Sequence, residues 1–283
     1  MQKEFEDRVC VVIVDDGSIN YNYNIDIAVN YIILKLKKNC GHQKAISIGL
    51  CWIYENLKED IPVVVMDSDG EDSPATIKYL LDSLADKNVD IAVAERRSRV
   101  ESFRFKMFYK IYQLIFWLLT GKRITWGNFM ALCPAAVKRL VCMDELPVHV
   151  AGAVLCSRLR YVKCPIRRSA RYVGKSKMNF SSLVSHGFKG IMIFAENVQA
   201  RIAIASAFVA IFTALGIVSA FLLKIWGLAS PGWLSSVSGL LIIIFLQMVS
   251  LSLGALLITG VKKFPQQPIE EYKKYIDDIF PYA

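Results

Sequence analysis

Two long uncharged apolar runs limit the fold of this chain more than any other feature. They cover Ile202–Leu223 and Leu234–Val261, and Gln247 is the only strongly polar residue of the second run. A helix needs about 20 apolar residues to cross the hydrocarbon core of a bilayer. Trp226 and Trp233 lie in the short segment between the runs, where they suit a membrane interface. The runs therefore predict a transmembrane hairpin.

The cations that flank these runs predict the orientation of the hairpin. The connecting segment carries only Lys224, whereas the outer flanks carry Lys175, Lys177, Lys189, Arg201, Lys262 and Lys263. Cytoplasmic flanks are enriched in Lys and Arg. We therefore expect a membrane protein with two spans whose N-terminal domain and C-terminal tail are cytoplasmic.

The predicted organisation has four parts. Residues 1–178 form a cytoplasmic domain, residues 179–201 a juxtamembrane amphipathic helix, residues 202–261 the two membrane helices, and residues 262–283 a cytoplasmic tail. The alternating acids and lysines of the tail predict a solvated helix.

Two basic and aromatic segments, 104–123 and 180–198, allow two interpretations. Each could be an amphipathic helix that lies on the bilayer, or a core helix with a solvated basic face. The neighbouring hairpin favours membrane contact.

Charge and cysteine content restrict the partners and the compartment. The net charge is +9, and the cations concentrate near the apolar runs, which favours lipid and phosphate over nucleic acid as partners. The seven cysteines are scattered singly without a Cys-x-x-Cys pair, so we expect a reduced compartment and no disulfide framework. The N-terminus lacks the apolar stretch of a signal peptide.

The first hundred residues predict an α/β domain. Continuous apolar strands are expected at Val9–Val14, Pro62–Met66 and Val89–Ala94, with a helical segment near Ile25–Lys35. Continuous rather than alternating apolar strands indicate a sheet covered on both faces. Acidic turns follow the first two strands, and ligands of such sheets bind beyond the carboxyl ends of the strands.

The segment from Asp67 to Asp72 is the sharpest motif in the sequence. It places four carboxylates in six positions directly after an apolar strand. Carboxylates this close repel one another unless a cation lies among them, and a hard divalent ion with oxygen ligands, Mg²⁺ or Mn²⁺, suits that role. The alternative is a polar turn that caps a helix starting near Pro74, with Asp72 or Ser73 as the N-cap.

Five motifs occur in an order that resembles one known family. They are Val14-Asp-Asp-Gly-Ser18, Asn39-Cys-Gly-His-Gln-Lys-Ala45 with Gly49, Met66-Asp-Ser-Asp-Gly-Glu-Asp-Ser-Pro74, Gly127-Asn-Phe129 and Arg171-Tyr-Val-Gly-Lys-Ser-Lys177. Together with the two-span anchor they resemble the polyprenyl-phosphate branch of family 2 glycosyltransferases. The resemblance implies a nucleotide-sugar-binding α/β fold of the GT-A type, with a mixed, mainly parallel sheet and helices on both faces.

The resemblance also implies roles for individual residues. Asp67, Asp69 and Glu71 would surround Mg²⁺ or Mn²⁺, and Asp69, Arg171 and Lys177 would be catalytic. The nucleotide-sugar would contact Asp15, Asp16, Asn39, His42 and Asp67. The acceptor phosphate would contact Arg171, Ser176 and Lys177, with Arg96 and Arg99 as further candidates. Residues 167–189 carry six basic residues and no acid, which independently suits phosphate.

The implied reaction moves a sugar from a UDP- or GDP-linked donor to a polyisoprenyl phosphate, with inversion, in cell-envelope glycan synthesis. The phosphate is already a nucleophile at neutral pH, so no general base is required.

Family members begin with a further strand that lies inside the sheet, and this chain starts just before the second strand. We therefore expect a gap in the sheet. The alternative function is an inactive membrane-anchored relative that binds lipid phosphate or a partner. The sequence leaves open the identity of the sugar, the length of the isoprenoid and the oligomeric state, and it is compatible with a homo-oligomer.

Overall fold

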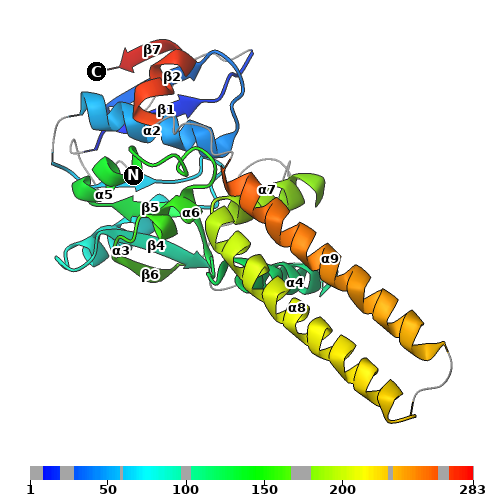
Figure 1. Cartoon of the computed structure of the whole chain (residues 1–283). Helices are drawn as coiled ribbons and strands as arrows, with labels where there is room; N and C mark the ends of the chain where they lie inside the picture. The colour runs from blue at the N-terminus through cyan, green and yellow to red at the C-terminus, as the bar shows by residue number, and fades with distance from the viewer. Residues whose placement is uncertain are drawn as a thin grey trace. The chain divides into compact units, whose positions relative to one another are not determined.

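The computed structural model describes residues 9–19, 29–57, 60–96, 103–166, 180–228, 232–260 and 268–282. The chain divides into two compact units. The sheet unit contains residues 1–106, 124–193 and 265–283, and the helical unit contains residues 107–123 and 194–264. The helices and strands are labelled as in Figure 1.

The sheet unit holds two mixed sheets. One has the order β1-β2-β7 and the other the order β3-β5-β4-β6. Among the described pairings, β1–β2 and β4–β6 are parallel, and the other three are antiparallel. The strands are β1 (Val11–Asp15), β2 (Tyr31–Leu36), β3 (Val63–Val65), β4 (Ile91–Arg96), β5 (Trp126–Leu132), β6 (Tyr161–Ile166) and β7 (Ile276–Tyr282). The predicted α/β class is confirmed.

Helices cover both faces of β4. Successive side chains of a strand point to opposite faces of its sheet, and in β4 the two sets of side chains pack against different helices. Ile91 and Val93 belong to the larger hydrophobic cluster, together with residues of α2 (His42–Asn56), α5 (Pro134–Leu140) and α6 (Val150–Cys156). Ala92 and Ala94 belong to a second cluster, against α3 (Ile77–Leu84). The larger cluster also contains Leu34 of β2, so one core connects the two sheets.

The described strands form two separate sheets. Among them, β1 pairs only with β2 and β3 pairs only with β5, so no strand pairing joins the two sheets. All five residues of β1 are half-buried although four of them are apolar. The expected gap in the sheet stays a prediction, because residues 1–8 lie outside the described residues.

Two local expectations are wrong. The helix expected near Ile25–Lys35 is not observed over its described part, where Tyr31–Leu36 forms β2. The apolar and aromatic residues Tyr31, Ile32, Ile33 and Leu34 favour a strand, and pairing with β1 selects it.

The expected solvated helix in the tail is also wrong over the described residues. There the chain forms a short helix α10 (Pro268–Glu271), a 3₁₀ turn η2 (Tyr272–Tyr275) and the edge strand β7. Tyr272 is only 2% exposed, and its hydroxyl donates to Glu55 on α2 at 2.6 Å. Because charge alternation in sequence does not reveal distant partners, it could not predict this return to the sheet.

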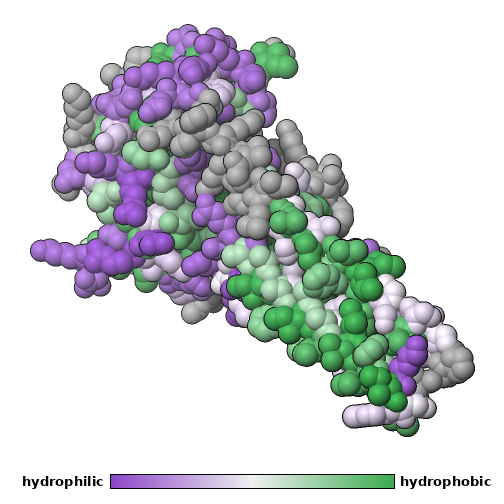
Figure 2. All heavy atoms as spheres, in the orientation of Figure 1, coloured by the Kyte–Doolittle hydropathy of each residue, from purple (hydrophilic) through white to green (hydrophobic). Residues whose placement is uncertain are grey.

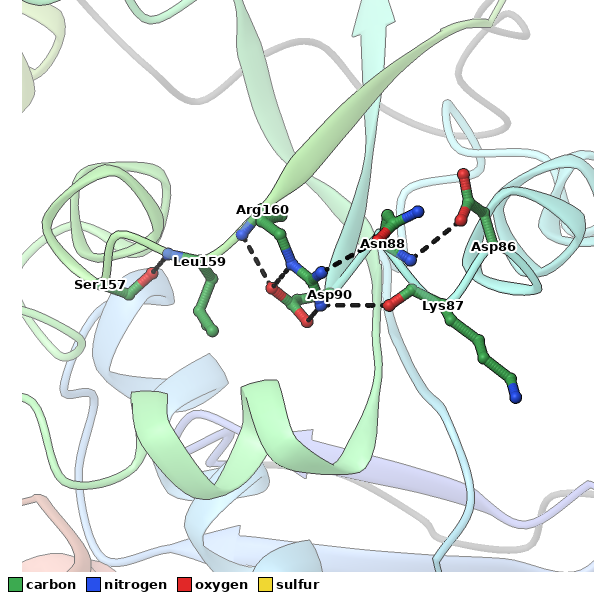
Figure 3. Close-up of polar contacts among 7 residues, drawn as sticks. All are labelled: Asp86, Lys87, Asn88, Asp90, Ser157, Leu159 and Arg160. Carbon is green, nitrogen blue, oxygen red and sulfur yellow. Dashed lines mark hydrogen bonds and ion pairs between the residues drawn. The ribbon is translucent and has the colours of Figure 1, made fainter.

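A polar cluster fixes the starts of the parallel strands β4 and β6 (Figure 3). The main-chain N–H and the Nε–H of Arg160 donate to Asp90 Oδ2 at 2.9 and 3.0 Å, and Nη2 donates to Oδ1 at 2.9 Å. Nη2 also donates to the carbonyl of Lys87 at 3.1 Å. Arg160 lowers the pKa of the Asp90 carboxyl, chiefly through its side-chain hydrogen bonds. These contacts tie the turn before β4 to the residue that precedes β6.

The helical unit is built on a hairpin of α8 (Ala195–Ile225) and α9 (Trp233–Gly260), which pack against each other (Figure 1). Both helices are long and apolar enough to cross a membrane. Their apolar side chains are mostly exposed, and Figure 2 shows this apolar surface along the hairpin. Most of α4 (Phe103–Thr120) lies in the same unit, and the helix is followed by Gly121, whose φ is +72°. Arg201 of α8 donates to the carbonyl of Leu118 in α4 at 3.3 Å.

The helix α7 (Phe180–Met192) belongs to the sheet unit. Val184, Phe188 and Met192 are exposed at intervals of four residues, so they form a stripe along one face of the helix.

Candidate functional site

The turn after β1 is organised by the carboxylate of Asp16. Its Oδ1 accepts from the main-chain N–H of Cys40 at 2.6 Å, and its Oδ2 accepts from that of Gly41 at 2.9 Å. Gly17 has a φ of +78°, and a Cβ there would lie 2.6 Å from the Asn39 nitrogen. The Asp-Gly turn therefore packs main chain to main chain against the loop that carries Asn39. Asp15 accepts from the N–H of Ser18 at 3.1 Å.

A second loop, after β3, folds around its own carboxylates. The N–H of Asp67 donates to Asp72 Oδ2 at 3.1 Å, and Asp72 is only 2% exposed. The N–H of Glu71 donates to Asp69 Oδ1 at 3.0 Å. Asp72 thus shapes the turn, and Ser73 precedes the 3₁₀ turn η1 (Pro74–Thr76) without a side-chain cap bond.

His42 connects these two loops. It is the first residue of α2, and its Nε2 lies 3.2 Å from Asp67 Oδ1. Hydrogen bonding to Asp67 raises the pKa of His42 above its ordinary value, burial opposes the rise, and the charges of Asp67, Asp16 and Asp69 add to it. The structure therefore brings together three residues that the sequence assigned to donor binding: Asp16, His42 and Asp67.

Two further side chains belong to this site, and the sequence analysis gave them no role. Asn128 of β5 places its Nδ2 2.8 Å from His42 Nε2. Gln43 donates from Nε2 to Asn128 Oδ1 at 3.2 Å and accepts from the N–H of Val150 at 2.7 Å. Both residues fall inside recognised motifs, but their partners lie 85 and 107 positions away. Sequence spacing carries no signal for such contacts.

A pair of histidines lies at the start of α6. His149 is its N-cap, and its Nδ1 accepts from the N–H of Gly152 at 3.0 Å. The His149 and His186 rings stack with their centroids 4.6 Å apart. Burial lowers the pKa of His149 to about 4, with a smaller contribution from His186. Burial, followed by Lys189 and His42, lowers the pKa of His186. His149 therefore caps the start of α6 and has a structural role.

Several predicted phosphate ligands cannot be placed. Arg99, Arg171, Ser176 and Lys177 lie outside the described residues, and Arg96 is described only by its main chain, at the end of β4. Their assignment stays a prediction.

The carboxylates after β3 fit a metal ion only in combination with a substrate. Among the described residues, no three His, Cys, Asp or Glu side chains converge in a group that could hold a metal ion. Mg²⁺ is commonly bound by one or two carboxylates plus substrate phosphates and water, rather than by a cage of protein ligands. Asp67, Asp69 and Glu71 suit that kind of site because they are hard oxygen donors on one short turn.

Comparison with known proteins gives a family match over the region that contains these loops. Residues 2–141 match the family described as Glycosyl transferase family 2.

Individual relatives agree with this match. The chain is 24% identical over 257 residues to an uncharacterized glycosyltransferase, YkoT, of Bacillus subtilis (strain 168). The aligned region covers 86% of this chain and 73% of the relative. This chain is also 24% identical over 186 residues to the undecaprenyl-phosphate 4-deoxy-4-formamido-L-arabinose transferase of Salmonella paratyphi B. That aligned region covers 62% of this chain. The same enzyme of Salmonella newport matches equally. The aligned region spans only 54%, about half, of these Salmonella relatives.

Proposed function

This chain carries a family 2 glycosyltransferase domain and is a glycosyltransferase; from that premise we propose that it transfers a sugar from a nucleotide-sugar to a polyisoprenyl phosphate. The observation that supports this proposal most is the meeting of His42 and Asp67, 3.2 Å apart, beyond the end of β3. Ligands of α/β sheets bind at this end of the strands. The name of the Salmonella relatives, an undecaprenyl-phosphate sugar transferase, supports a lipid phosphate as the acceptor.

In this proposal the two acidic loops serve the donor. Asp15, Asp16 and Asn39 line the nucleotide, and His42 and Asp67 lie nearer the diphosphate. Asp16 is already held by two main-chain N–H groups, which fixes its loop before the donor binds. Preorganised groups of this kind lower the reorganisation needed during the reaction.

A divalent ion completes the proposed donor site. Asp67, Asp69 and Glu71 would hold Mg²⁺ or Mn²⁺ against the diphosphate. Bound there, the ion would neutralise charge that develops on the leaving nucleoside diphosphate.

The acceptor needs positioning more than activation. A phosphomonoester carries roughly −1.5 to −2 charges at pH 7 and is itself the nucleophile. Arg171, Ser176 and Lys177, with Arg96 and Arg99, would hold its oxygens in line with the anomeric carbon. Attack from the face opposite the leaving diphosphate gives inversion. Asp69, Arg171 and Lys177 are the residues that we assign to catalysis.

The helical unit would deliver the lipid acceptor. We propose that α8 and α9 span the membrane, because they are uncharged over most of their length and their apolar side chains are exposed. An exposed apolar surface of this extent marks a membrane or protein contact. More Lys and Arg residues flank the outer ends of the hairpin than its turn, which carries only Lys224. This distribution favours a cytoplasmic location for the sheet unit. The apolar stripe of α7 suits a helix lying on the bilayer surface.

A transfer assay tests this function. Purified protein in detergent or vesicles is incubated with undecaprenyl or dolichyl phosphate, Mg²⁺ or Mn²⁺, and a panel of labelled UDP- and GDP-sugars. We expect a labelled glycolipid from one donor, and none after EDTA is added. Product that is insensitive to EDTA would contradict the metal assignment. No product from any donor, with an active relative alongside, would favour an inactive lipid-phosphate-binding protein.

A further inference from the structure

Tyr275, in the C-terminal segment, contacts the chain on both sides of the loop between β2 and α2. Its carbonyl accepts from the main-chain N–H of Lys37 at 2.9 Å. Its ring centroid lies 3.7 Å from Lys44 Nζ. Lys37 directly follows β2, and Lys44 lies in the first turn of α2. Tyr275 therefore contacts both flanks of residues 38–42, which we name the donor loop.

The middle of the donor loop is held by other contacts. Asp16 accepts from the N–H groups of Cys40 and Gly41 at 2.6 and 2.9 Å. A Cβ at Gly17 would lie 2.6 Å from the Asn39 nitrogen, so the main chains are packed closely there. The turn after β1 thus fixes the middle of the loop, and Tyr275 contacts its two flanks.

A register shift in the pairing of β2 with β7 brings Tyr275 to the donor loop (Figure 1). The shift falls between Lys35 and Leu36, and Leu36 pairs with Ile276. The next residue, Lys37, then meets the carbonyl of Tyr275. Without the shift, Lys37 would lie opposite Ile276. Irregularities of this kind re-aim residues and are common next to active sites.

The C-terminal segment is fixed on both sides of Tyr275. Before it, Tyr272 is 2% exposed and donates to Glu55 in the last turn of α2 at 2.6 Å. After it, Asp277 lies 3.4 Å from Lys35 Nζ on β2. Tyr275 is therefore held in place by the elements that flank the donor loop.

The ring of Tyr275 also answers a local electrostatic need. The helix dipole disfavours a cation in the first turn of a helix, and the first turn of α2 contains no acidic residue. The negative face of an aromatic ring attracts an ammonium group. The ring therefore offsets the charge of Lys44 and fixes its side chain.

We propose that Tyr275 is a positioning residue for the nucleotide-sugar, because it holds both flanks of the donor loop. The proposal rests on the proposed function, which sets Asn39 and His42 of this loop against the donor. Tyr275 acts through Lys37 and Lys44, so a displaced ring shifts the loop as a unit. Small displacements of positioning groups can lower activity strongly.

The direct test compares three variants of the full-length protein by hydrogen exchange with mass spectrometry. Tyr275→Leu removes the ring face, Tyr275→Phe keeps it, and Lys44→Met removes the ammonium from the other side of the contact. The contact with the Lys37 N–H is to the main chain and stays possible in all three. Tyr79→Leu and Lys78→Met make the same changes at exposed positions on α3 and are the controls.

Exchange in the donor loop should follow the ring face. We expect faster exchange over residues 38–42 in Tyr275→Leu and Lys44→Met. We expect no change in Tyr275→Phe or in the two controls. Thermal unfolding checks that each variant is folded. Unchanged exchange in folded Tyr275→Leu and Lys44→Met would overturn the proposal.

Transfer kinetics give a readout that a loss of stability alone would not move. Tyr275→Leu and Lys44→Met should each raise the KM for the nucleotide-sugar by about tenfold, within the range of a partly desolvated cation–π contact. The KM for the polyisoprenyl phosphate should stay the same, and Tyr275→Phe should restore the unmodified values. The double variant should match either single one, because both remove the same contact. Additive effects, or an equal rise in the acceptor KM, would overturn the proposal.

The two readouts separate this proposal from the proposed function. Loop exchange needs no substrate, so it tests the hold on the donor loop by itself. The expected exchange without transfer by the unmodified protein would overturn the proposed function and leave the hold on the loop standing. Transfer with unchanged loop exchange and an unchanged donor KM in Tyr275→Leu would overturn the positioning role alone.

Discussion

His42 Nε2 lies 3.2 Å from Asp67 Oδ1, so the first turn of α2 and the loop after β3 meet at one point. This contact joins the two acidic loops that the sequence assigns to donor binding. The charges of Asp16 and Asp69 also act on His42, which places them in the same electrostatic neighbourhood. In the proposed function, a donor diphosphate bound here would need a cation to offset these carboxylates.

The first prediction concerns that cation. Asp69→Asn should weaken Mn²⁺-dependent binding of a nucleoside diphosphate by at least about tenfold, because a hard cation loses one anionic ligand. The substitution keeps an oxygen that can accept from the N–H of Glu71, so the turn should stay folded. Isothermal titration with UDP and GDP, with and without Mn²⁺, measures the loss. Asp82→Asn on α3 makes the same change elsewhere on the sheet unit and should bind normally. Equal binding by both variants would remove Asp69 from the site.

The second prediction concerns acid stability. The pKa of His149 is about 4 in the folded protein, below its ordinary value of 6.5. The unfolded chain therefore binds more protons between these values, and the free energy of unfolding falls as the pH drops from about 6.5 towards 4. One histidine with this shift contributes on the order of 3 kcal/mol to the fall.

His149→Asn isolates this contribution. Asparagine is a favourable N-cap, so the start of α6 should be preserved. The variant cannot titrate, and it should lose less stability than the unmodified protein over the same pH range. Denaturant unfolding in detergent at several pH values measures the difference. Parallel pH dependences for the two proteins would show that His149 does not titrate as stated.

The third prediction concerns the C-terminal segment, which returns to the sheet unit. Tyr272 is 2% exposed, and its hydroxyl and Lys273 both contact Glu55. Tyr272→Ala should lower the free energy of unfolding by about 3–5 kcal/mol, as truncation of a buried aromatic side chain does. Tyr272→Phe keeps the ring and should cost about 1–2 kcal/mol for the lost hydrogen bond. Tyr79→Phe, at an exposed position, is the control and should have little effect. Similar values for all three variants would show that the segment does not dock as described.

The fold was predictable from sequence where the signal is local. The three apolar strand segments and the two uncharged runs are properties of single segments, and they predict β1, β3, β4, α8 and α9. The failures involve distant pairing. Tyr31–Leu36 becomes a strand because β1 lies beside it, and Ile276–Tyr282 becomes a strand because β2 has a free edge. A charged tail contains no local sign of such a partner.

The residues of the candidate site also differ in how well the sequence predicts them. Asp16, His42 and Asp67 stand out because they occupy motifs with a family resemblance, and the structure brings them together. Gln43 and Asn128 lie in two of these motifs as well, but their neutral amide side chains do not single them out in sequence. Their contacts with each other and with the Val150 N–H join distant segments, and no side-chain pattern records such contacts.

The central claim is that a polyisoprenyl phosphate receives the sugar, and the most direct measurement compares two acceptors. The protein is supplied with Mn²⁺, a labelled nucleotide-sugar panel and vesicles that contain either undecaprenyl phosphate or undecaprenol. The phosphate is the proposed nucleophile, so labelled glycolipid should form only with undecaprenyl phosphate. Equal product from undecaprenol, or transfer to a water-soluble acceptor instead, would contradict the account.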